Sequence, residues 1–267
     1  MEINEILGFF GALMIGLILG LIGGGGSILT LPILVYVLGI NPLLASAYSL
    51  FVVGCTALIG TIQNFTKGFL EIRVGLIFAI PSLIGVYLTR AYFIHWLPEY
   101  LFFLGEKPFT KDLFIMLLFV LLMLAAAYFM INGKELSKSL KLINAKQRLL
   151  LAFEGLIVGV LTGVVGAGGG FLIVPVLVLL TGLEMKKAIA TSLLIIAIKS
   201  LIGFLGDLQN LEIDWNLLFL FTAISIVGIF VGTFLRKFIS NKGLKKGFGY
   251  FVLLMAIYII SKEVINL

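Results

Sequence analysis

The chain has 267 residues, of which 61% are hydrophobic and 12% charged, and its mean hydropathy is +1.21. A soluble domain of this length would need far more polar surface, so the composition indicates an integral membrane protein with almost no soluble part. The basic residues behind the net charge of +6 cluster in the segments 132–148 and 236–246. This clustering is typical of cytoplasmic loops and not of a nucleic-acid-binding surface.

Ten apolar segments follow one another along the chain, and each is predicted to be helical. In the first half they lie at 6–22, 28–38, 43–62, 74–94 and 112–131. In the second half they lie at 149–165, 171–181, 187–206, 215–235 and 246–261. The second segment of each half reaches only about 17 Å as a helix, whereas a hydrocarbon core is about 30 Å thick. The predicted fold class is all-α integral membrane, with about ten helical segments.

The two halves repeat each other at an offset of 143 residues, which places Pro32 over Pro175. At this offset small residues coincide along several segments. The coinciding pairs are Gly16 with Gly159, Gly20 with Gly163, Gly23 with Gly166, Gly39 with Gly182, Ser49 with Ser192 and Gly60 with Gly203. A series of this kind indicates an internal duplication. We therefore divide the chain into a first transmembrane repeat at 1–131, a basic cytoplasmic linker at 132–148 and a second transmembrane repeat at 149–267.

The charge distribution predicts that the second repeat is inverted relative to the first. If the short segments 28–38 and 171–181 both cross the membrane, each repeat has five crossings, and an odd number inverts the second copy. Lys186, Lys187 and the segment 236–246 then lie on the same side as the linker, as the positive-inside rule requires. If the short segments do not cross, the two most basic loops lie on opposite faces of the membrane, which violates the positive-inside rule. We therefore expect a multi-pass protein of the cell membrane with both termini outside.

A glycine-rich break interrupts the apolar pattern near the start of each repeat. Backbone at membrane depth is tolerated only where it is buried in protein or lines a cavity, and two inverted breaks would meet near the midplane. New helices begin after the breaks, at about Ser27 and about Phe171, and their N-terminal ends favour an anion. Ser27 is also a candidate N-cap. We predict that the breaks line a substrate site, the alternative being helix packing, which we expect for Gly16, Gly20, Gly159 and Gly163. The candidate break residues are Gly23, Gly24, Gly25, Gly26, Gly166, Gly168, Gly169 and Gly170.

Lys199 is a charged residue inside the predicted helix 187–206. A lysine at the bilayer centre costs about 2.5–3.5 kcal/mol on insertion scales, so such residues usually face a cavity or a partner, although a lysine near a helix end can snorkel to the interface. Its repeat mate, Thr56, is uncharged, so the two half-sites are not equivalent. Ser49 and Ser192 either bond to their own helices or face the cavity. A lone buried cation opposite two helix N-termini predicts an anionic substrate.

Other kinds of chemistry lack a signature in the sequence. There is no phosphate-binding GxxxxGK[ST] loop, no dinucleotide fingerprint and no His, Cys, Asp or Glu cluster with metal-ligand spacing. Ser27 would need a nearby base to act as a nucleophile, and the single histidine, His95, falls at a predicted interface. Asn64 and Asp207 end the third segment of each repeat, where they either line a vestibule or cap the loop, and loop capping is the expected role. We therefore predict no catalytic residue, no cofactor and no metal.

The glycine segments at 20–50 and 159–194 resemble the paired signatures of the TauE/SafE sulfite exporter family. The shared pattern is a glycine-rich stretch, a proline, a short apolar run and a small-residue helix, and the resemblance covers nearly the whole chain. It implies a permease for small sulfur-containing anions such as sulfite, thiosulfate or organosulfonates. It also assigns binding to the motif glycines and to Ser49 and Ser192. Two departures are Lys199, where an asparagine is expected, and Asn64 with Asp207, where histidines are common.

The combined expectation is a secondary transporter that moves a small anion across the lipid bilayer by alternating access. Without an ATP-binding motif, coupling to a proton or another ion, or facilitated movement, is expected. An anion channel and a non-transporting scaffold or sensor are the alternatives. The candidate substrate-binding residues are Gly23, Gly24, Gly25, Gly26, Ser27, Ser49, Thr56, Gly166, Gly168, Gly169, Gly170, Ser192 and Lys199.

Overall fold

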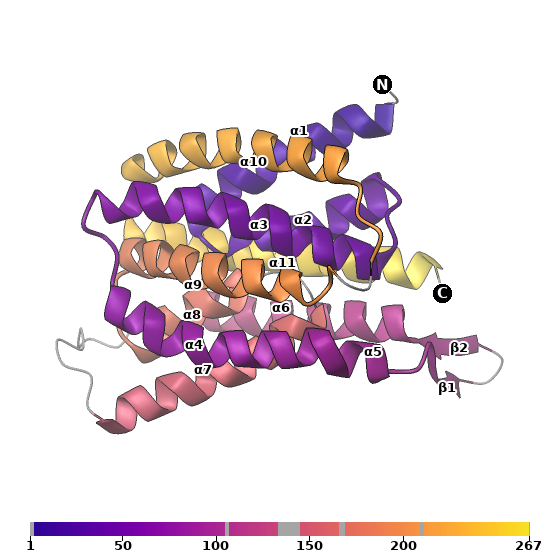
Figure 1. Cartoon of the computed structure of the whole chain (residues 1–267). Coiled ribbons are helices and arrows are strands. Elements are labelled where there is room, and N and C mark those ends of the chain that lie inside the picture. The colour runs from indigo at the N-terminus through magenta and orange to yellow at the C-terminus, as the bar shows by residue number, and fades with distance from the viewer. Residues whose placement is uncertain (1–2, 105–106, 133–144, 166–168, 209–210, 267) are drawn as a thin grey trace.

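The computed structural model describes residues 3–104, 107–132, 145–165, 169–208 and 211–266, and within these ranges the fold is a bundle of helices (Figure 1). Seven helices in the described part are long and apolar enough to cross a membrane. The prediction of an all-α, multi-pass membrane protein is thereby confirmed. The inverted relation between the two repeats stays a prediction.

The first half contains each of its expected segments. Its helices are α1 (Ile3–Ile22), α2 (Gly25–Pro32), α3 (Pro42–Phe65), α4 (Ile72–Leu88), the single turn α5 (Ile94–Trp96) and α6 (Lys111–Asn132). Two π-helical stretches extend them: η1 (Ile33–Val37) continues α2, and η2 (Thr89–Phe93) continues α4. Pro32 therefore neither ends nor visibly breaks the short helix, because the backbone continues past it with wider turns.

The second half follows the same order. Its helices are α7 (Ala145–Val165), α8 (Gly170–Leu180), α9 (Met185–Leu205), α10 (Trp215–Leu235), the 3-10 turn η3 (Arg236–Phe238) and α11 (Asn241–Asn266). α7 begins at Ala145, inside the segment that the sequence analysis assigns to the linker. Pro175 lies inside α8 without ending it.

The loop between α5 and α6 forms an antiparallel hairpin that the sequence analysis did not predict. Its strands are β1 (Tyr100–Leu104) and β2 (Lys107–Thr110), and Tyr100 pairs with Thr110. Aromatic residues in this loop favour extended structure. The hairpin lies outside the bundle, at the end where α6 begins (Figure 1).

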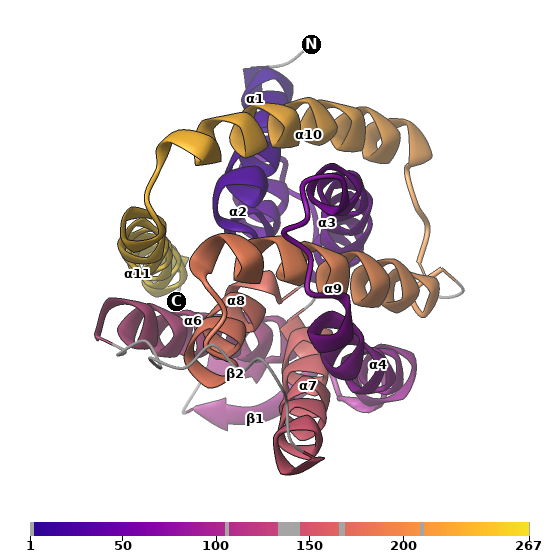
Figure 2. The same ribbon diagram turned by 90° about the vertical axis from the view of Figure 1, so that its left-hand side faces the viewer.

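The helices pack in pairs that join the two halves. α1 packs on α10 and α4 on α7, while α3 packs on α9, α6 on α11 and α2 on α8. Viewed along the bundle, α9 lies near the centre, with α2, α3 and α8 beside it and the other long helices around them (Figure 2). The helices of the first half, α1, α2, α3, α4 and α6, correspond in order to α7, α8, α9, α10 and α11 of the second half. Replacing each helix by its counterpart turns the pair of α1 with α10 into the pair of α7 with α4, and every other pair into itself. The set of pairs is therefore the same for both halves.

Glycines allow the backbones of the paired helices to touch. A Cβ on Gly20 in α1 would lie 2.7 Å from the backbone nitrogen of Thr233 in α10, and one on Gly16 would overlap the carbonyl group of Ser225. In the other pair, Gly159 of α7 similarly faces the backbone of Ser82 in α4. Small residues are what such close helix crossings require. The packing role predicted for these glycines is confirmed.

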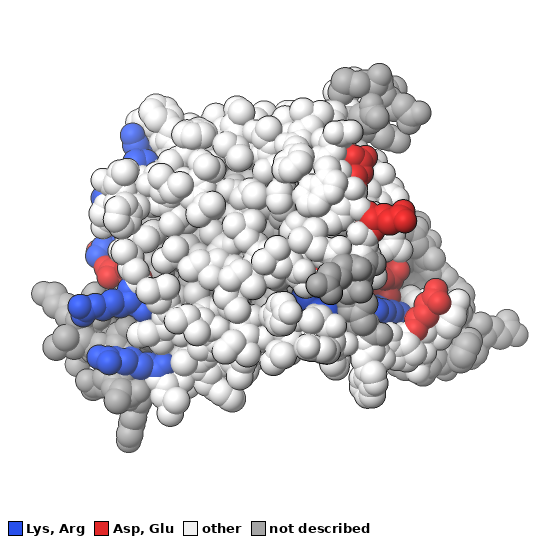
Figure 3. Space-filling view, viewed as in Figure 1, with Lys and Arg blue, Asp and Glu red and all other residues white. Residues whose placement is uncertain are grey.

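On the face shown in Figure 3 most of the basic side chains lie at one end of the bundle and most of the acidic side chains at the other. We call the end at which α3 and α10 finish the basic end; Lys67, Lys187 and Lys237 lie at its helix termini. The opposite end, where α3 and α10 begin, is the acidic end and carries Asp112 and Asp214. The first residues of α1 and the last residues of α11 both lie at the acidic end (Figure 1).

Candidate functional site

The two glycine breaks touch each other through their main chains. A Cβ on Gly170 would lie 2.5 Å from the Cα of Gly24, and a Cβ on Gly24 would overlap the carbonyl group of Gly170. Gly23 and Gly169 have φ angles of +77° and +64°, in the left-handed region that glycine adopts without strain. The chain therefore changes direction at both breaks, and only glycine fits where they meet.

Each break leads directly into a short helix. Gly24 is the N-cap of α2 and Gly169 is the N-cap of α8, and neither supplies a side-chain capping bond. The first amides of a helix have no acceptor within it, so these two helix starts keep donors available. The expectation that Ser27 is the N-cap is wrong: Ser27 lies inside the first turn of α2, and its hydroxyl donates to the carbonyl of Gly24 at 2.7 Å.

Lys199 lies against the break of the second half. Its side chain is 1% exposed, and its Nζ donates to the Thr162 hydroxyl at 2.9 Å. A Cβ on Gly169 would lie 2.6 Å from the same nitrogen. Lys199 belongs to neither of the two ion pairs among the described residues, which join Arg90 to Asp207 and Lys187 to Glu71. The site therefore holds a buried ammonium, and within the described part of the chain its hydrogen-bond partner is the Thr162 hydroxyl of α7.

Of the other predicted residues, Ser192 lies beside the first break. A Cβ on Gly23 would lie 2.7 Å from the Ser192 hydroxyl, which donates to the carbonyl of Ile189 at 2.8 Å. The Ser49 hydroxyl is buried and has no hydrogen-bond partner within the described part of the chain. The structure thus brings together Gly23 with Ser192, Gly24 with Gly170, and Gly169 with Lys199.

Three other predicted residues have different contacts, and their role in binding stays a prediction. The Thr56 hydroxyl donates to the carbonyl of Val52 at 2.6 Å, one turn back in α3. Gly25 and Gly26 face side chains and backbone of α1, including Ile18 and Leu19, so they allow close packing of α2 on α1. Gly166 and Gly168 lie outside the described residues.

Two buried arginines, which the sequence analysis did not single out, connect helices at the two ends of the bundle. At the acidic end Arg90 is 0% exposed; its Nε donates to Asp207 at 3.0 Å, and its Nη2 donates to the Ser46 hydroxyl at 2.8 Å. At the basic end Arg236 donates to the side-chain oxygen of Asn64. Asn64 and Asp207, for which loop capping is expected, thus each bind an arginine of another helix.

The two arginine contacts occupy corresponding places in the two halves. Arg90 lies just past the end of α4 and contacts the residues that end α9, and Arg236 lies just past the end of α10 and contacts the end of α3. The sequence offered one signal for Arg90, because it is a charged residue inside the predicted apolar segment 74–94. Nothing in the sequence pattern pointed to Thr162, a threonine in an apolar helix.

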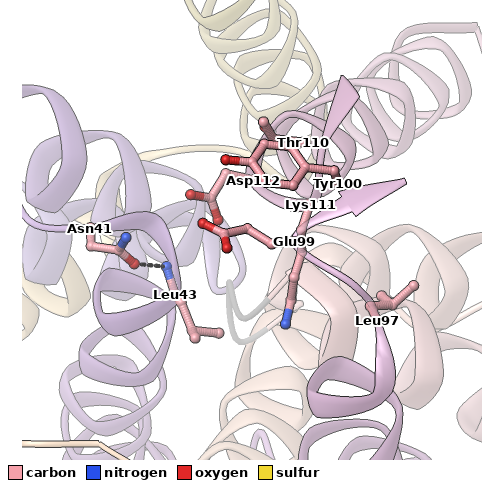
Figure 4. A pocket seen from close by; sticks show the side chains of 8 residues that line it. All are labelled: Asn41, Leu43, Leu97, Glu99, Tyr100, Thr110, Lys111 and Asp112. Atoms are coloured by element: carbon pink, nitrogen blue, oxygen red, sulfur yellow. Dashed lines mark hydrogen bonds between the residues drawn. The ribbon is translucent and has the colours of Figure 1, made fainter. Parts of the chain in front are cut away.

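A pocket of about 350 Å³ lies at the acidic end beside the hairpin (Figure 4). The carboxylates of Glu99 and Asp112 lie close together in it, while the Lys111 ammonium turns away and donates to the carbonyl of Ile94. The Asn41 side chain caps α3 by accepting from the Leu43 amide at 2.9 Å. An anion would meet two negative groups here, so this pocket does not suit the predicted substrate.

Comparison with known proteins gives consistent results over most of the chain. A model of the family described as sulfite exporter TauE/SafE matches residues 8–259. A probable membrane transporter protein of Xylella fastidiosa is 32% identical over 255 residues, covering 94% of this chain and 92% of the relative. The probable membrane transporter protein YunE of Bacillus subtilis is 28% identical over 233 residues, covering 76% and 79%. No solved structure gives a significant match.

Proposed function

We propose a function from one premise: this chain belongs to the sulfite exporter TauE/SafE family, and it is a multi-pass membrane transporter. The proposal is that it is a secondary transporter for a small anion, of the sulfur-containing class that includes sulfite, thiosulfate and organosulfonates. The anion would bind where the two glycine breaks meet and would reach either side of the membrane by alternating access.

The buried ammonium of Lys199 carries the proposal. An ammonium has three N–H donors, and Thr162 accepts one of them, which leaves donors for the oxygen atoms of an anion. A charge at 1% exposure is costly unless a partner compensates it, and a bound anion supplies that compensation. The starts of α2 and α8 add main-chain donors and positive dipole ends next to the same place.

The shape of the site supports a compact oxyanion. Gly23, Gly24, Gly169 and Gly170 have no side chains, so the backbone itself lies at the surface of the site. The Ser192 hydroxyl from the central helix α9 lies beside Gly23 and donates its proton to the Ile189 carbonyl, so the donors left for the anion are the Lys199 ammonium and the first amides of α2 and α8. Several donors converging on a small volume match a pyramidal or tetrahedral anion with several oxygens, as sulfite, thiosulfate and sulfonates are.

The helix pairing and the arginine contacts support alternating access. A set of pairs that is unchanged when the halves exchange is what an inverted repeat with a pseudo-two-fold axis would produce. Arg90 with Asp207 joins α4 to α9 at the acidic end, and Arg236 with Asn64 joins α10 to α3 at the basic end. In our proposal, opening one of these contacts at a time exposes the site to one side. Coupling to a proton or ion gradient would drive the movement.

Binding and counterflow by the purified protein test this proposal. We expect sulfur oxyanions to raise the thermal unfolding midpoint of the wild type, and this stabilisation to disappear in Lys199→Met and return in part in Lys199→Arg. Lys187→Met is the matched control on the same helix, because Lys187 is 39% exposed and pairs with Glu71. Lack of stabilisation by any sulfur oxyanion would contradict the substrate class, and an undiminished response in Lys199→Met would contradict the site.

Counterflow in proteoliposomes separates the transporter from an anion channel. Trans-loaded sulfite should accelerate uptake of labelled sulfite if a carrier alternates between the two sides. Flux that does not saturate and shows no acceleration would favour a channel that uses the same breaks as a filter.

A further inference from the structure

A second pocket, of about 250 Å³, lies at the basic end between the end of α3 and the end of α10. It shares no residue with the site at the glycine breaks. None of its lining residues is acidic, and five of the seven carry side-chain hydrogen-bond donors. The lining residues are Gln63, Thr66, Lys67, Phe230, Thr233, Phe234 and Lys237.

Two of the lining donors have no hydrogen-bond partner within the described part of the chain. Thr233 is 3% exposed, and its hydroxyl is unpaired, as is the buried amide nitrogen of Gln63. Thr222, on the same helix, donates to the carbonyl of Leu218 at 2.7 Å, which is the usual bond of a helical threonine. A buried donor without an acceptor costs about 1–3 kcal/mol, so these two groups indicate a ligand with acceptor atoms.

Three cations surround these donors. Lys67 and Lys237 line the pocket, and Arg236, which is 4% exposed, lies beside it and keeps one buried guanidinium nitrogen without a partner in the described chain. Partial burial lowers the pKa of Lys67, and the positive charges of Lys237 and Arg236 lower it further. A bound anion would relieve this repulsion.

We propose that this pocket is a binding site for a phosphate-type oxyanion, held by Lys67 and Lys237 and hydrogen-bonded by Thr233 and Gln63. The ligand is the headgroup of an anionic phospholipid or a free phosphate. Phe230 and Phe234 are both 55% exposed and flank the pocket on a helix of membrane-spanning length, so acyl chains can lie beside it. Basic pockets between transmembrane helices on the cytoplasmic side recognise anionic headgroups in this way.

Thermal unfolding of the full chain in detergent, with three additives, tests the site. The additives are a short-chain phosphatidylglycerol, the phosphatidylcholine with the same acyl chains, and inorganic phosphate. We expect phosphatidylglycerol to raise the unfolding midpoint and phosphatidylcholine to have no effect. A response to inorganic phosphate as well would identify a free anion as sufficient, and a response to phosphatidylglycerol alone would identify the lipid. No response to either anion would overturn the proposal.

Variants test whether the stabilisation by phosphatidylglycerol arises at this pocket. Lys67→Gln combined with Thr233→Val should raise the half-maximal phosphatidylglycerol concentration at least tenfold, whereas Lys242→Gln at the same end and Thr222→Val on the same helix should leave it unchanged. Lys237→Gln is the second variant if the double variant fails to fold, and it should raise the same concentration severalfold. Lys199→Met should respond like the wild type. An unchanged response in the pocket variants, or its loss in Lys199→Met, would overturn the proposal.

Discussion

Replacing Gly170 by alanine is the sharpest test of the contact between the two breaks. The added Cβ would lie 2.5 Å from the Gly24 Cα, about 0.9 Å closer than the 3.4 Å at which ordinary contact begins. Gly170 itself begins α8 with helical backbone, so alanine meets no conformational obstacle there. The same Cβ would also lie 2.5 Å from Cδ1 of Ile196, whose side chain can turn aside, but the Gly24 Cα is backbone, so the breaks must separate by most of that distance. Overpacking of this kind costs about 1–3 kcal/mol.

Two measurements would report the effect of Gly170→Ala. We expect a lower midpoint in thermal unfolding and a loss of anion counterflow, because the donors at the breaks would no longer converge. Gly247→Ala is the control: it lies in α11, its added Cβ would meet no atom of a neighbouring element within 4 Å, and alanine in a helix is favoured over glycine by about 1 kcal/mol. If Gly170→Ala matched the wild type in both assays, the inference that the two breaks form one site would be refuted.

Three further substitutions test the residues around the breaks and at the two ends. Asp207→Ala should destabilise the protein by about 3–5 kcal/mol in denaturant unfolding, because Arg90 stays buried, and the double variant Arg90→Met with Asp207→Leu should recover most of the loss. Asn64→Asp should turn the contact with Arg236 into an ion pair and slow counterflow, although it also removes the Asn64 amide donor to the Gly60 carbonyl; faster counterflow would contradict the gating role. Thr162→Val should weaken anion binding about tenfold in titrations by removing the partner that orients Lys199, and unchanged affinity would contradict that role.

The sequence predicted the elements of the fold better than the contacts between them. Runs of apolar residues predict membrane helices directly, since each must satisfy its own backbone hydrogen bonds in lipid. The repeated glycines also marked where the helices break, and the break residues Gly24 and Gly170 do meet. Helix starts were displaced by one or two residues, because Gly24 and Gly169 cap their helices without any side-chain signal.

The polar contacts were harder to predict because they join distant parts of the chain. Arg90 and Asp207 lie 117 residues apart, and Arg236 and Asn64 lie 172 apart, so no local pattern connects them. Lys199 stood out as a charge within an apolar helix, but its partner Thr162 did not, since threonine is common in such helices. The hairpin was missed because the loop between α5 and α6 carries too few alternating residues to predict a strand pair.

The main-chain contact between Gly24 and Gly170 has a consequence for the history of the chain. A larger residue at either position cannot be compensated by a smaller side chain opposite, because neither position has a side chain to reduce. We therefore expect both glycines to persist together in related transporters while residues near them diverge, as Thr56 and Lys199 illustrate in this chain. The residues around this contact can therefore diverge between the two halves, while the contact itself stays the same.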